Sequence, residues 1–195
     1  MTRAVHPIEQ ESYAILRRRI DLSHLPPLSR AVVERVVHAS ADVGYASDLV
    51  LDERALQAGR AALEAGAPVV ADVGMVAAGV TGREVVCGIR TAVPRTGETR
   101  SSAAVREALD EVGPGAVWVV GCAPTALQTL IELSRSGGAA PALVVGLPVG
   151  FVGAAESKAA LRASGLPAVS NVSEKGGSAV AAAALNALLY AEEPA

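Results

Sequence analysis

His38 is the residue of this sequence best suited to proton transfer. It is one of 3 histidines and lies near the end of an apolar helical stretch, in the run Val-Val-His-Ala-Ser. An imidazole titrates near neutral pH, so it can exchange a proton with a substrate. Two other interpretations stay open, a protonated histidine favoured by the dipole at a helix C-terminus and a partly buried core imidazole. His6 and His24 lie beside or near proline in loop-like sequence and need no special role.

Two segments combine a positive charge with the start of a predicted helix. Arg100 stands between Thr99 and Ser101, just ahead of an alanine-rich helical segment. A guanidinium beside the free N–H groups of a helix N-terminus would bind a carboxylate or a phosphate. The alternative is a solvated Arg100 next to Ser101 or Ser102 as a simple N-cap. A similar arrangement precedes the last helix, where the residues are Lys175, Gly176, Gly177 and Ser178.

Other candidate residues carry weaker signals. Asp42 and Asp72 could hold a ligand or His38, although acids at turns more often cap backbone N–H groups. Cys87 and Cys122 are far apart and lack CxxC spacing, which favours two small buried thiols over a redox pair or a zinc site. No histidine pair has the spacing of metal ligands, so we expect no metal.

Nucleotide and nucleophile motifs are absent as well. The sequence contains no GxGxxG after a strand, no complete GxxxxGK[ST] and no GxSxG. The remaining set, one histidine and several loops that can bind anions, suits a proton-assisted rearrangement or the binding of a polycarboxylate, and we expect no cofactor.

The elements that must position these residues alternate along the chain. Short, mostly apolar runs bounded by Gly or Pro predict strands buried on both faces, at residues 67–73, 84–89, 116–120, 141–147 and 167–171. Helical segments lie between and around them, at residues 28–39, 52–65, 101–112, 125–134, 155–163 and 179–191. This order predicts an α/β fold with a mainly parallel, doubly wound sheet. Ligands of such folds bind beyond the carboxyl ends of the strands.

Composition excludes several classes of protein. The 195 residues include 17 Lys+Arg and 20 Asp+Glu, with a formal net charge of -3, so no basic surface is expected for nucleic acid or an anionic membrane. The most apolar tract, residues 179–191, is too short to span a bilayer, and the N-terminal segment lacks the apolar stretch of a secretory signal. We expect one domain over residues 1–195, a cytoplasmic location, and no nucleic-acid or membrane partner.

Together, the loop sequences resemble those of the precorrin-8X methylmutases, a family of the cobalamin pathway that also has a cobalt-precorrin-8 form. The resemblance covers nearly the whole chain, and its longest and most specific run is PVGFVGAAESK at residues 148–158. The other matching segments are residues 6–9 with Ser12, residues 37–39, Asp72 with residues 75–77, Gly97 with residues 99–101, residues 123–127, residues 175–178 and the alanine-rich final helix.

This resemblance implies a flavodoxin-like three-layer α/β/α sandwich and a homodimer with active sites near the subunit interface. It implies an isomerase that moves a methyl group from C-11 to C-12 of precorrin-8X or cobalt-precorrin-8, giving hydrogenobyrinic acid or cobyrinic acid. His38 corresponds to the proton donor of the family, and Arg100 and Ser12 correspond to residues by the substrate. The many carboxylates of this tetrapyrrole agree with anion binding at Thr99, Ser101 and residues 175–178.

The sequence also departs from the family pattern. Cys122 stands where the family commonly has Asn, Gly74 replaces a usually larger polar or charged residue, and residues 81–90 look shortened. These changes could alter a substrate contact or the choice between metal-free and cobalt-containing substrate.

Two competing hypotheses remain at this stage. The first is a flavodoxin-like module that binds a nucleotide or flavin through the same loops without catalysis. The second is a purely structural dimer, and the alanine-rich final helix is the only feature of the sequence that supports it. The small residues 181–184, followed by Leu185, Leu188 and Leu189, could form a subunit interface or cover the sheet of their own subunit.

Overall fold

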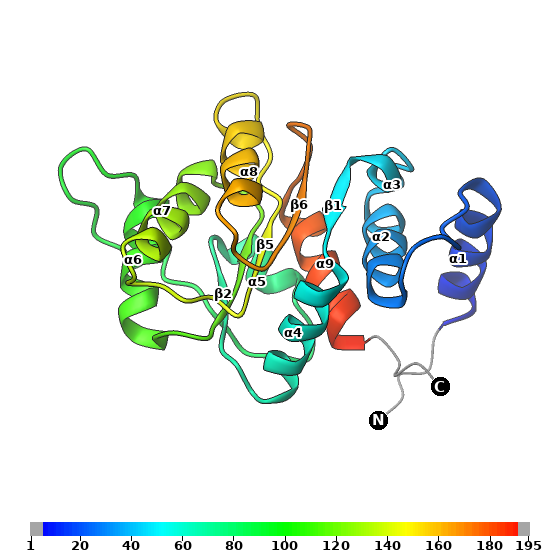
Figure 1. Cartoon of the computed structure of the whole chain (residues 1–195), viewed down its shortest axis with the longest axis horizontal. Coiled ribbons are helices and arrows are strands. Elements are labelled where there is room, and N and C mark those ends of the chain that lie inside the picture. The colour runs from blue at the N-terminus through cyan, green and yellow to red at the C-terminus, as the bar shows by residue number, and fades with distance from the viewer. Residues whose placement is uncertain (1–5, 191–195) are drawn as a thin grey trace.

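A mostly parallel, six-stranded sheet forms the centre of the protein (Figure 1). The structure, a computed structural model, describes residues 6–190. The strands are β1 (Leu49–Leu51), β2 (Val69–Ala71), β3 (Val85–Val86), β4 (Val117–Val120), β5 (Leu143–Gly146) and β6 (Ala168–Asn171). Their spatial order is β1-β6-β5-β4-β2-β3, and only β1 runs antiparallel to its neighbour. The mixed α/β class with a mainly parallel sheet is therefore confirmed.

Helices occupy much of the remaining chain. Within residues 6–190 they are α1 (Pro7–Arg19), α2 (Pro27–Ser40), α3 (Tyr45–Asp48), α4 (Glu53–Glu64), α5 (Gly74–Gly79), α6 (Arg100–Val112), α7 (Pro124–Arg135), α8 (Ala154–Ala163) and α9 (Ser178–Tyr190). The expected end of the last helix at residue 191 lies outside the described residues.

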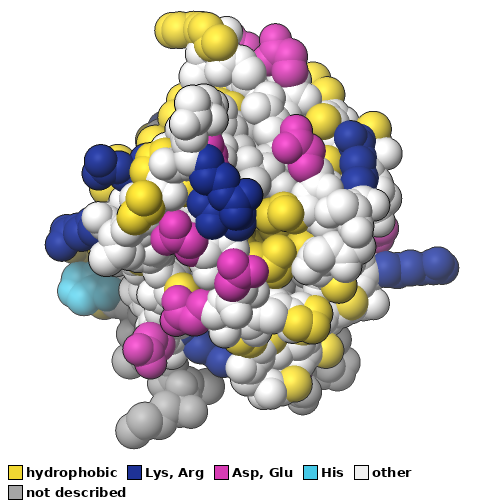
Figure 2. Space-filling view, turned by 90° about the vertical axis from the view of Figure 1, so that its left-hand side faces the viewer, with side chains coloured by type: hydrophobic (Ala, Val, Ile, Leu, Met, Phe, Trp, Pro, Cys, Tyr) yellow, Lys and Arg dark blue, Asp and Glu magenta, His cyan; other side chains and the backbone are white. Residues whose placement is uncertain are grey.

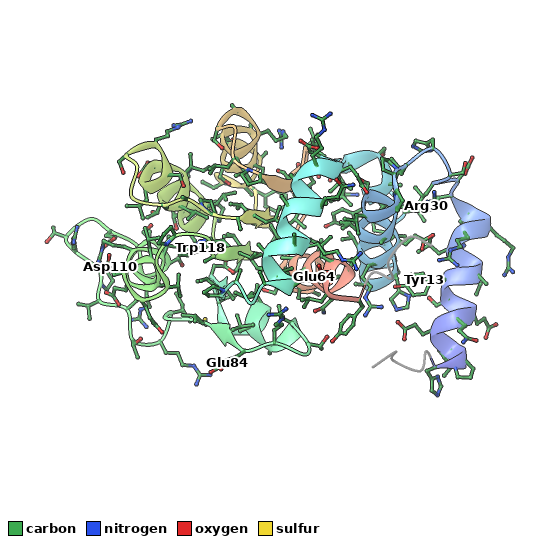
Figure 3. The ribbon with its side chains drawn as sticks, turned by 60° about the horizontal axis from the view of Figure 1, so that its bottom comes forward. Tyr13, Arg30, Glu64, Glu84, Asp110 and Trp118 are labelled. Carbon is green, nitrogen blue, oxygen red and sulfur yellow. The ribbon has the colours of Figure 1, made fainter. Side chains whose placement is uncertain are left out.

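Both faces of the sheet are covered, because alternate side chains of each strand point to opposite sides. Val117 and Val119 of β4 join a core cluster with residues of α2, α4, α5 and α9. Trp118 and Val120 join a second cluster with residues of α6, α7 and α8, and Trp118 lies in the interior between these elements (Figure 3). This arrangement explains why the strands are apolar at nearly every position.

The structure contains elements that the apolar patterns did not predict. Helix α1 was missed because its sequence is mostly polar, and it lies at one end of the molecule beside α2 (Figure 1). Strand β1 has only 3 residues, α5 has 6, and the strand predicted at residues 84–89 is limited to Val85–Val86. The ring nitrogen Nδ1 of His6 accepts from the N–H of Ile8 at 3.3 Å, so this histidine caps α1.

Helix α9 covers the sheet of its own subunit. Nine of its residues, from Val180 to Leu188, are buried within the single chain, and the helix packs mainly against α2 and α5. A Cβ atom on Gly79 of α5 would lie 2.7 Å from that of Ala182, so the small residues permit close helix packing. Of the two interpretations of this helix, the structure therefore supports the second, in which its apolar side chains cover the sheet of their own subunit.

The surface carries no large basic region on the face shown in Figure 2, where acidic, basic and apolar side chains are interspersed. Among residues 6–190, no helix combines the length and the apolar character needed to cross a membrane.

Candidate active site

The loops that follow β2 and β4 are joined by Asp72. Its carboxylate accepts hydrogen bonds from the N–H groups of Gly121, Cys122 and Ala123 at 3.1, 2.8 and 2.8 Å. Burial raises the pKa of Asp72, against the opposing effect of these hydrogen bonds. Asp72 therefore caps backbone groups at the carboxyl edge of the sheet, and it makes no hydrogen bond to His38.

Thr99 and Thr125 connect the next two segments along this edge. The Oγ1 atom of Thr99 caps α6 by accepting from the N–H of Ser102 at 3.1 Å, and it lies 3.0 Å from Oγ1 of Thr125 at the start of α7. The expectation that Ser101 or Ser102 caps this helix is therefore wrong. Ser101 lies in the first helical turn and is partly buried.

Arg100 follows Thr99 at the first position of α6 and is exposed. Its guanidinium makes no hydrogen bond or ion pair with any residue in the described part of the chain. An exposed guanidinium without a protein partner is available to a carboxylate of a ligand.

The loops after β5 and β6 are in direct contact. The N–H of Gly177 donates to the carbonyl of Leu147 at 2.9 Å, and the N–H of Gly150 donates to that of Glu174 at 3.1 Å. Gly176 has a φ of +157°, and a Cβ atom there would overlap the carbonyl oxygens of Leu147 and Pro148. Glycine is thus required at position 176 by the close approach of two backbones.

Lys175 ties this loop to the end of α2. Its Nζ atom lies 2.7 Å from a carboxylate oxygen of Asp42, just beyond that helix, and 5.7 Å from the ring centre of Tyr45. The hydrogen bond from Lys175 lowers the pKa of Asp42, and the same bond raises the pKa of Lys175. The second proposed role of Asp42, a contact to His38, is not seen, because its carboxylate is taken up by Lys175 and by the N–H of Gly44.

His38 lies in the last turn of α2 and is held by α1. Its Nδ1 atom is 2.8 Å from the hydroxyl oxygen of Ser12, and its ring stacks on Tyr13 with 4.8 Å between ring centres and 13° between planes. Tyr13 projects from α1 toward α2 (Figure 3). No residue in the range 6–190 forms a hydrogen bond with Nε2 of His38. The chain thus orients the imidazole through one nitrogen and leaves the other for a ligand.

Ion pairs hold α1 in the position that this contact requires. The guanidinium of Arg17 makes two hydrogen bonds to the carboxylate of Glu34 at 2.8 and 2.7 Å. On the same pair of helices, Arg35 contacts Glu9 at 2.7 Å and the hydroxyl of Tyr13 at 3.1 Å. Two-pronged contacts of this kind define orientation as well as distance. Tyr13 and Arg35 were missed from the sequence, and Glu9 was named only within a matching segment. A prediction of α1 would have placed Glu9, Ser12 and Tyr13 on one helical face.

Two further expectations concern cysteine and metal. Cys87 and Cys122 are free, as expected for thiols outside a redox pair, but both are partly exposed rather than buried. Burial raises the pKa of the Cys122 thiol, and the nearby charge of Asp72 adds to this effect. Residues 6–190 contain no cluster of three or more His, Cys, Asp and Glu side chains that fits a metal ion.

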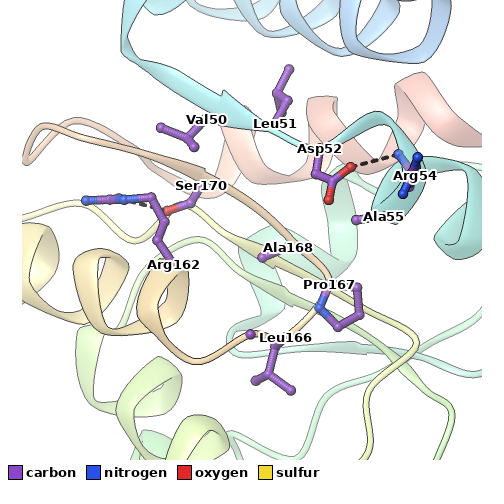
Figure 4. Close-up of a pocket in the computed structure, with 11 residues that line it drawn as sticks. Val50, Leu51, Asp52, Arg54, Ala55, Arg162, Leu166, Pro167, Ala168 and Ser170 are labelled. Atoms are coloured by element: carbon purple, nitrogen blue, oxygen red, sulfur yellow. Dashed lines mark hydrogen bonds between the residues drawn. The ribbon is translucent and has the colours of Figure 1, made fainter.

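A separate cavity of about 510 Å³ lies between β1, β6, α4 and α8 (Figure 4). Its lining includes Asp52, Arg54, Arg162, Pro167 and Ser170. Pro167 precedes β6, so the cavity reaches the amino end of that strand, away from the carboxyl edge. None of the predicted site residues lines this cavity.

The Asp42–Lys175 pair predicts a pH-dependent coupling between the two residues. Asp42 has a lowered pKa and Lys175 a raised one, so the pair stabilises the folded protein only while both are charged. A double-mutant cycle of Asp42→Asn and Lys175→Met, measured by urea unfolding, should give a favourable coupling energy at pH 7. The coupling should weaken as the pH falls below the usual range of an aspartate, and a coupling that stays the same throughout the acid range would contradict this account.

Comparison with known proteins agrees with this geometry. A family model described as precorrin-8X methylmutase matches residues 7–191. Precorrin-8X methylmutases of Pseudomonas aeruginosa and of a Sinorhizobium species are 43% and 42% identical, covering 95% and 93% of this chain and 95% and 92% of their own length. A cobalt-precorrin-8 methylmutase of Methanocaldococcus jannaschii is 40% identical over 81% of this chain and 77% of its own.

A solved structure shows the same fold. The crystal structure of a precorrin-8X methylmutase from Thermus thermophilus superimposes with a TM-score of 0.85 and 38% identity, covering 94% of this chain and 96% of the other. Sequence and structure agree over almost the full length of both proteins. The chain belongs to the precorrin-8X methylmutase family.

Proposed function

We propose that the protein is the isomerase that moves a methyl group from C-11 to C-12 of precorrin-8X or cobalt-precorrin-8. The product would be hydrogenobyrinic acid or cobyrinic acid, and the substrate itself supplies every atom of it. The observation that carries this proposal, beyond membership of the family, is the contact of His38 with Ser12 and Tyr13, because it leaves one ring nitrogen available to a ligand.

In this mechanism His38 donates a proton to the macrocycle. As the acid, the ring is an imidazolium with a proton on each nitrogen: Nδ1–H donates to the Ser12 hydroxyl, and Nε2–H, which faces no protein partner among the described residues, is the proton that is transferred and is taken back after the methyl shift. Protonation makes the conjugated ring system poorer in electrons. The bond from the methyl group to C-11 then breaks as the bond to C-12 forms. Tyr13 restricts rotation of the imidazole by stacking on it, so the proton is presented in one direction.

Carboxylates of the substrate would bind to the cationic and N–H-rich segments of the carboxyl edge. Arg100 is the strongest candidate because its guanidinium is exposed and has no partner in the described chain. Thr99 and Ser101 flank it at the start of α6. The loop at the start of α9 supplies the second group of binding residues, Lys175, Gly176, Gly177 and Ser178. The ammonium of Lys175 already pairs with Asp42, so a substrate carboxylate bound to this loop would compete with that ion pair.

We infer a flavodoxin-like three-layer α/β/α sandwich, with residues 1–195 as a single methylmutase-like domain. Without the antiparallel β1, the strands stand in the order β6-β5-β4-β2-β3. Numbered along the chain, this is the order 2-1-3-4-5 read from the other edge, which is the flavodoxin order. Two core clusters on opposite sides of the sheet support the layers, and the family match over residues 7–191 supports the single domain.

The protein is further proposed to be a cytoplasmic homodimer. Support for a dimer comes from exposed apolar side chains after β5 and β6, where Phe151, Val152 and Val172 are 94%, 89% and 56% exposed. Large apolar side chains that are exposed to this degree on neighbouring loops are consistent with an interaction site. Because these residues follow the strands that carry the binding loops, a partner there would help to enclose the substrate. The alternative of a flavin or nucleotide module has no comparable support, since the family match accounts for the same loops.

Replacement His38→Ala should reduce conversion of substrate at least about 10²-fold, because general acid catalysis contributes on that order or more. The fold should survive, since α1 and α2 remain joined by the Arg17–Glu34 and Arg35–Glu9 pairs. The assay mixes enzyme with precorrin-8X or cobalt-precorrin-8 and follows the visible spectrum, which changes with ring conjugation. Near-normal turnover at a matched folded fraction would remove His38 from the mechanism, and no conversion of either substrate by the wild type would refute the function.

Replacement Arg100→Ala should weaken product binding by about 1.5–3 kcal/mol, the value of a hydrogen bond to a charged group. Arg100→Lys should restore only part of the affinity, because an ammonium cannot form the two-pronged contact. Arg135→Ala is a matched control, since Arg135 is exposed in the last turn of α7, at the opposite end of that helix from the carboxyl edge. Titration of the visible spectrum measures the dissociation constants, and equal affinities for the two alanine variants would show that Arg100 does not contact the ligand.

Sedimentation at micromolar concentration should show a dimer, and activity should fall on dilution as the dimer dissociates. Phe151→Asp should shift the equilibrium to monomer, because it places a charge in the apolar surface after β5. Val93→Asp is the control, since Val93 is also exposed, at 71%, but lies in a different loop. A fully active wild-type monomer would refute the shared site.

A further inference from the structure

Lys158 is a buried cation that the proposed mechanism does not use. It belongs to α8 and has no exposed surface. Its Nζ atom donates to Oδ1 of Asn171 at 2.8 Å and to the carbonyls of Ser173 and Lys175 at 2.5 and 2.6 Å. All three acceptors are uncharged oxygens, so no carboxylate directly compensates the ammonium. Burial of a charge without a carboxylate in direct contact costs free energy of folding, which suggests that Lys158 serves a purpose other than stability.

Two of the three acceptors of Lys158 lie in the loop between β6 and α9. Burial lowers the pKa of Lys158 to about 8, so the ammonium form, with its three donors, still predominates at pH 7. Two of the three bonds go to main-chain carbonyls of residues 173 and 175. An ammonium at this position therefore controls the direction of two peptide groups.

Asp48 and Asn171 hold the same loop from the other side. The carboxylate of Asp48 accepts from the N–H groups of Val172 and Ser173 at 3.1 and 2.8 Å and from the hydroxyl of Ser173 at 2.7 Å. The side-chain amide of Asn171 donates to Asp48 at 2.7 Å and to the carbonyl of Lys175 at 3.0 Å. Lys158, Asp48 and Asn171 thus bind the loop on one side through several hydrogen bonds.

The opposite surface of the loop carries donors. Every described peptide bond is trans, so the N–H of a peptide group points away from its carbonyl. With the carbonyls of Ser173 and Lys175 turned toward Lys158, the N–H groups of Glu174 and Gly176 point away from it. Neither of these two N–H groups donates to any residue within the described chain.

We propose that Lys158 is a positioning residue for substrate binding, which fixes two carbonyls inward and so presents the N–H groups of Glu174 and Gly176 to a substrate carboxylate. Main-chain N–H groups that have no protein acceptor can bind an anion. Lys158 itself does not touch the ligand, because it is completely buried. This inference rests on the proposed function only in taking the carboxylate from the tetrapyrrole.

The test compares Lys158→Met with Leu161→Ala. Methionine is unbranched and nearly as long but has no donor, so the carbonyls of Ser173 and Lys175 lose their bonds to the ammonium and keep only those to the amide of Asn171. Leu161 is fully buried on the same helix and touches no part of the loop's hydrogen bonds, so its replacement destabilises the protein without releasing the loop. Both variants are studied below their melting temperatures, at a folded fraction checked by circular dichroism.

Hydrogenobyrinic acid serves as the probe in spectral titrations, and single turnover at saturating substrate measures the chemical step. For Lys158→Met we expect a dissociation constant raised at least about 10-fold and a single-turnover rate within about 3-fold of wild type. For Leu161→Ala we expect an affinity within about 2-fold of wild type. An unchanged affinity in Lys158→Met, or equal losses in both variants, would overturn the proposal.

A measurement on the wild type covers the case in which Lys158→Met fails to fold. In ¹⁵N-labelled protein, addition of hydrogenobyrinic acid should shift the amide signals of Glu174 and Gly176 and slow their hydrogen exchange. Bound product without any change at these two amides would also overturn the proposal. The same series measures conversion of substrate and binding of product by the wild type. If the wild type shows no conversion or no binding, the proposed function fails, and this result is distinct from failure of the role of Lys158.

Discussion

The parallel alignment of β2, β4, β5 and β6 is the constraint on which the rest of the structure depends. Their carboxyl ends meet at one edge, so segments far apart in sequence become neighbours there. Asp72 joins the first two loops, and the contact of Gly176 with Leu147 and Pro148 joins the last two. Both contacts involve main-chain groups of the loops, so they fix how the backbones of the candidate binding segments lie.

The candidate acid reaches this edge from a different part of the chain. His38 lies on α2, whose end is tied to the β6–α9 loop by the Asp42–Lys175 pair. Helix α1 then supplies Ser12 and Tyr13, and it is held on α2 largely by the Arg17–Glu34 and Arg35–Glu9 pairs. An exposed ion pair contributes little stability, but two pairs on one face define how the helices lie. The imidazole is therefore oriented by a polar interface at the edge of the apolar core.

Apolar periodicity predicted the strands of the parallel sheet and most of the helices that cover it, because burial on both faces leaves a clear pattern. It could not predict α1, whose sequence is mostly polar with Leu16 as its buried residue, or the three residues of β1. His38 and Arg100 were identified by residue type and family resemblance. Ser12 and His38 are 26 positions apart in the sequence, and no rule of sequence spacing predicts a contact between them. Lys158 was named only within a matching run, since a lysine is normally exposed and its sequence context gives no sign of burial.

The central proposal is that the macrocycle binds beside His38 at the α1–α2 interface, at the carboxyl edge of the sheet. A crystal structure of the protein with bound hydrogenobyrinic acid tests this claim most directly. The account predicts Nε2 of His38 within contact of the ring system and a ligand carboxylate on the guanidinium of Arg100. A macrocycle seated instead in the cavity between β1, α4 and α8, remote from His38, would contradict it.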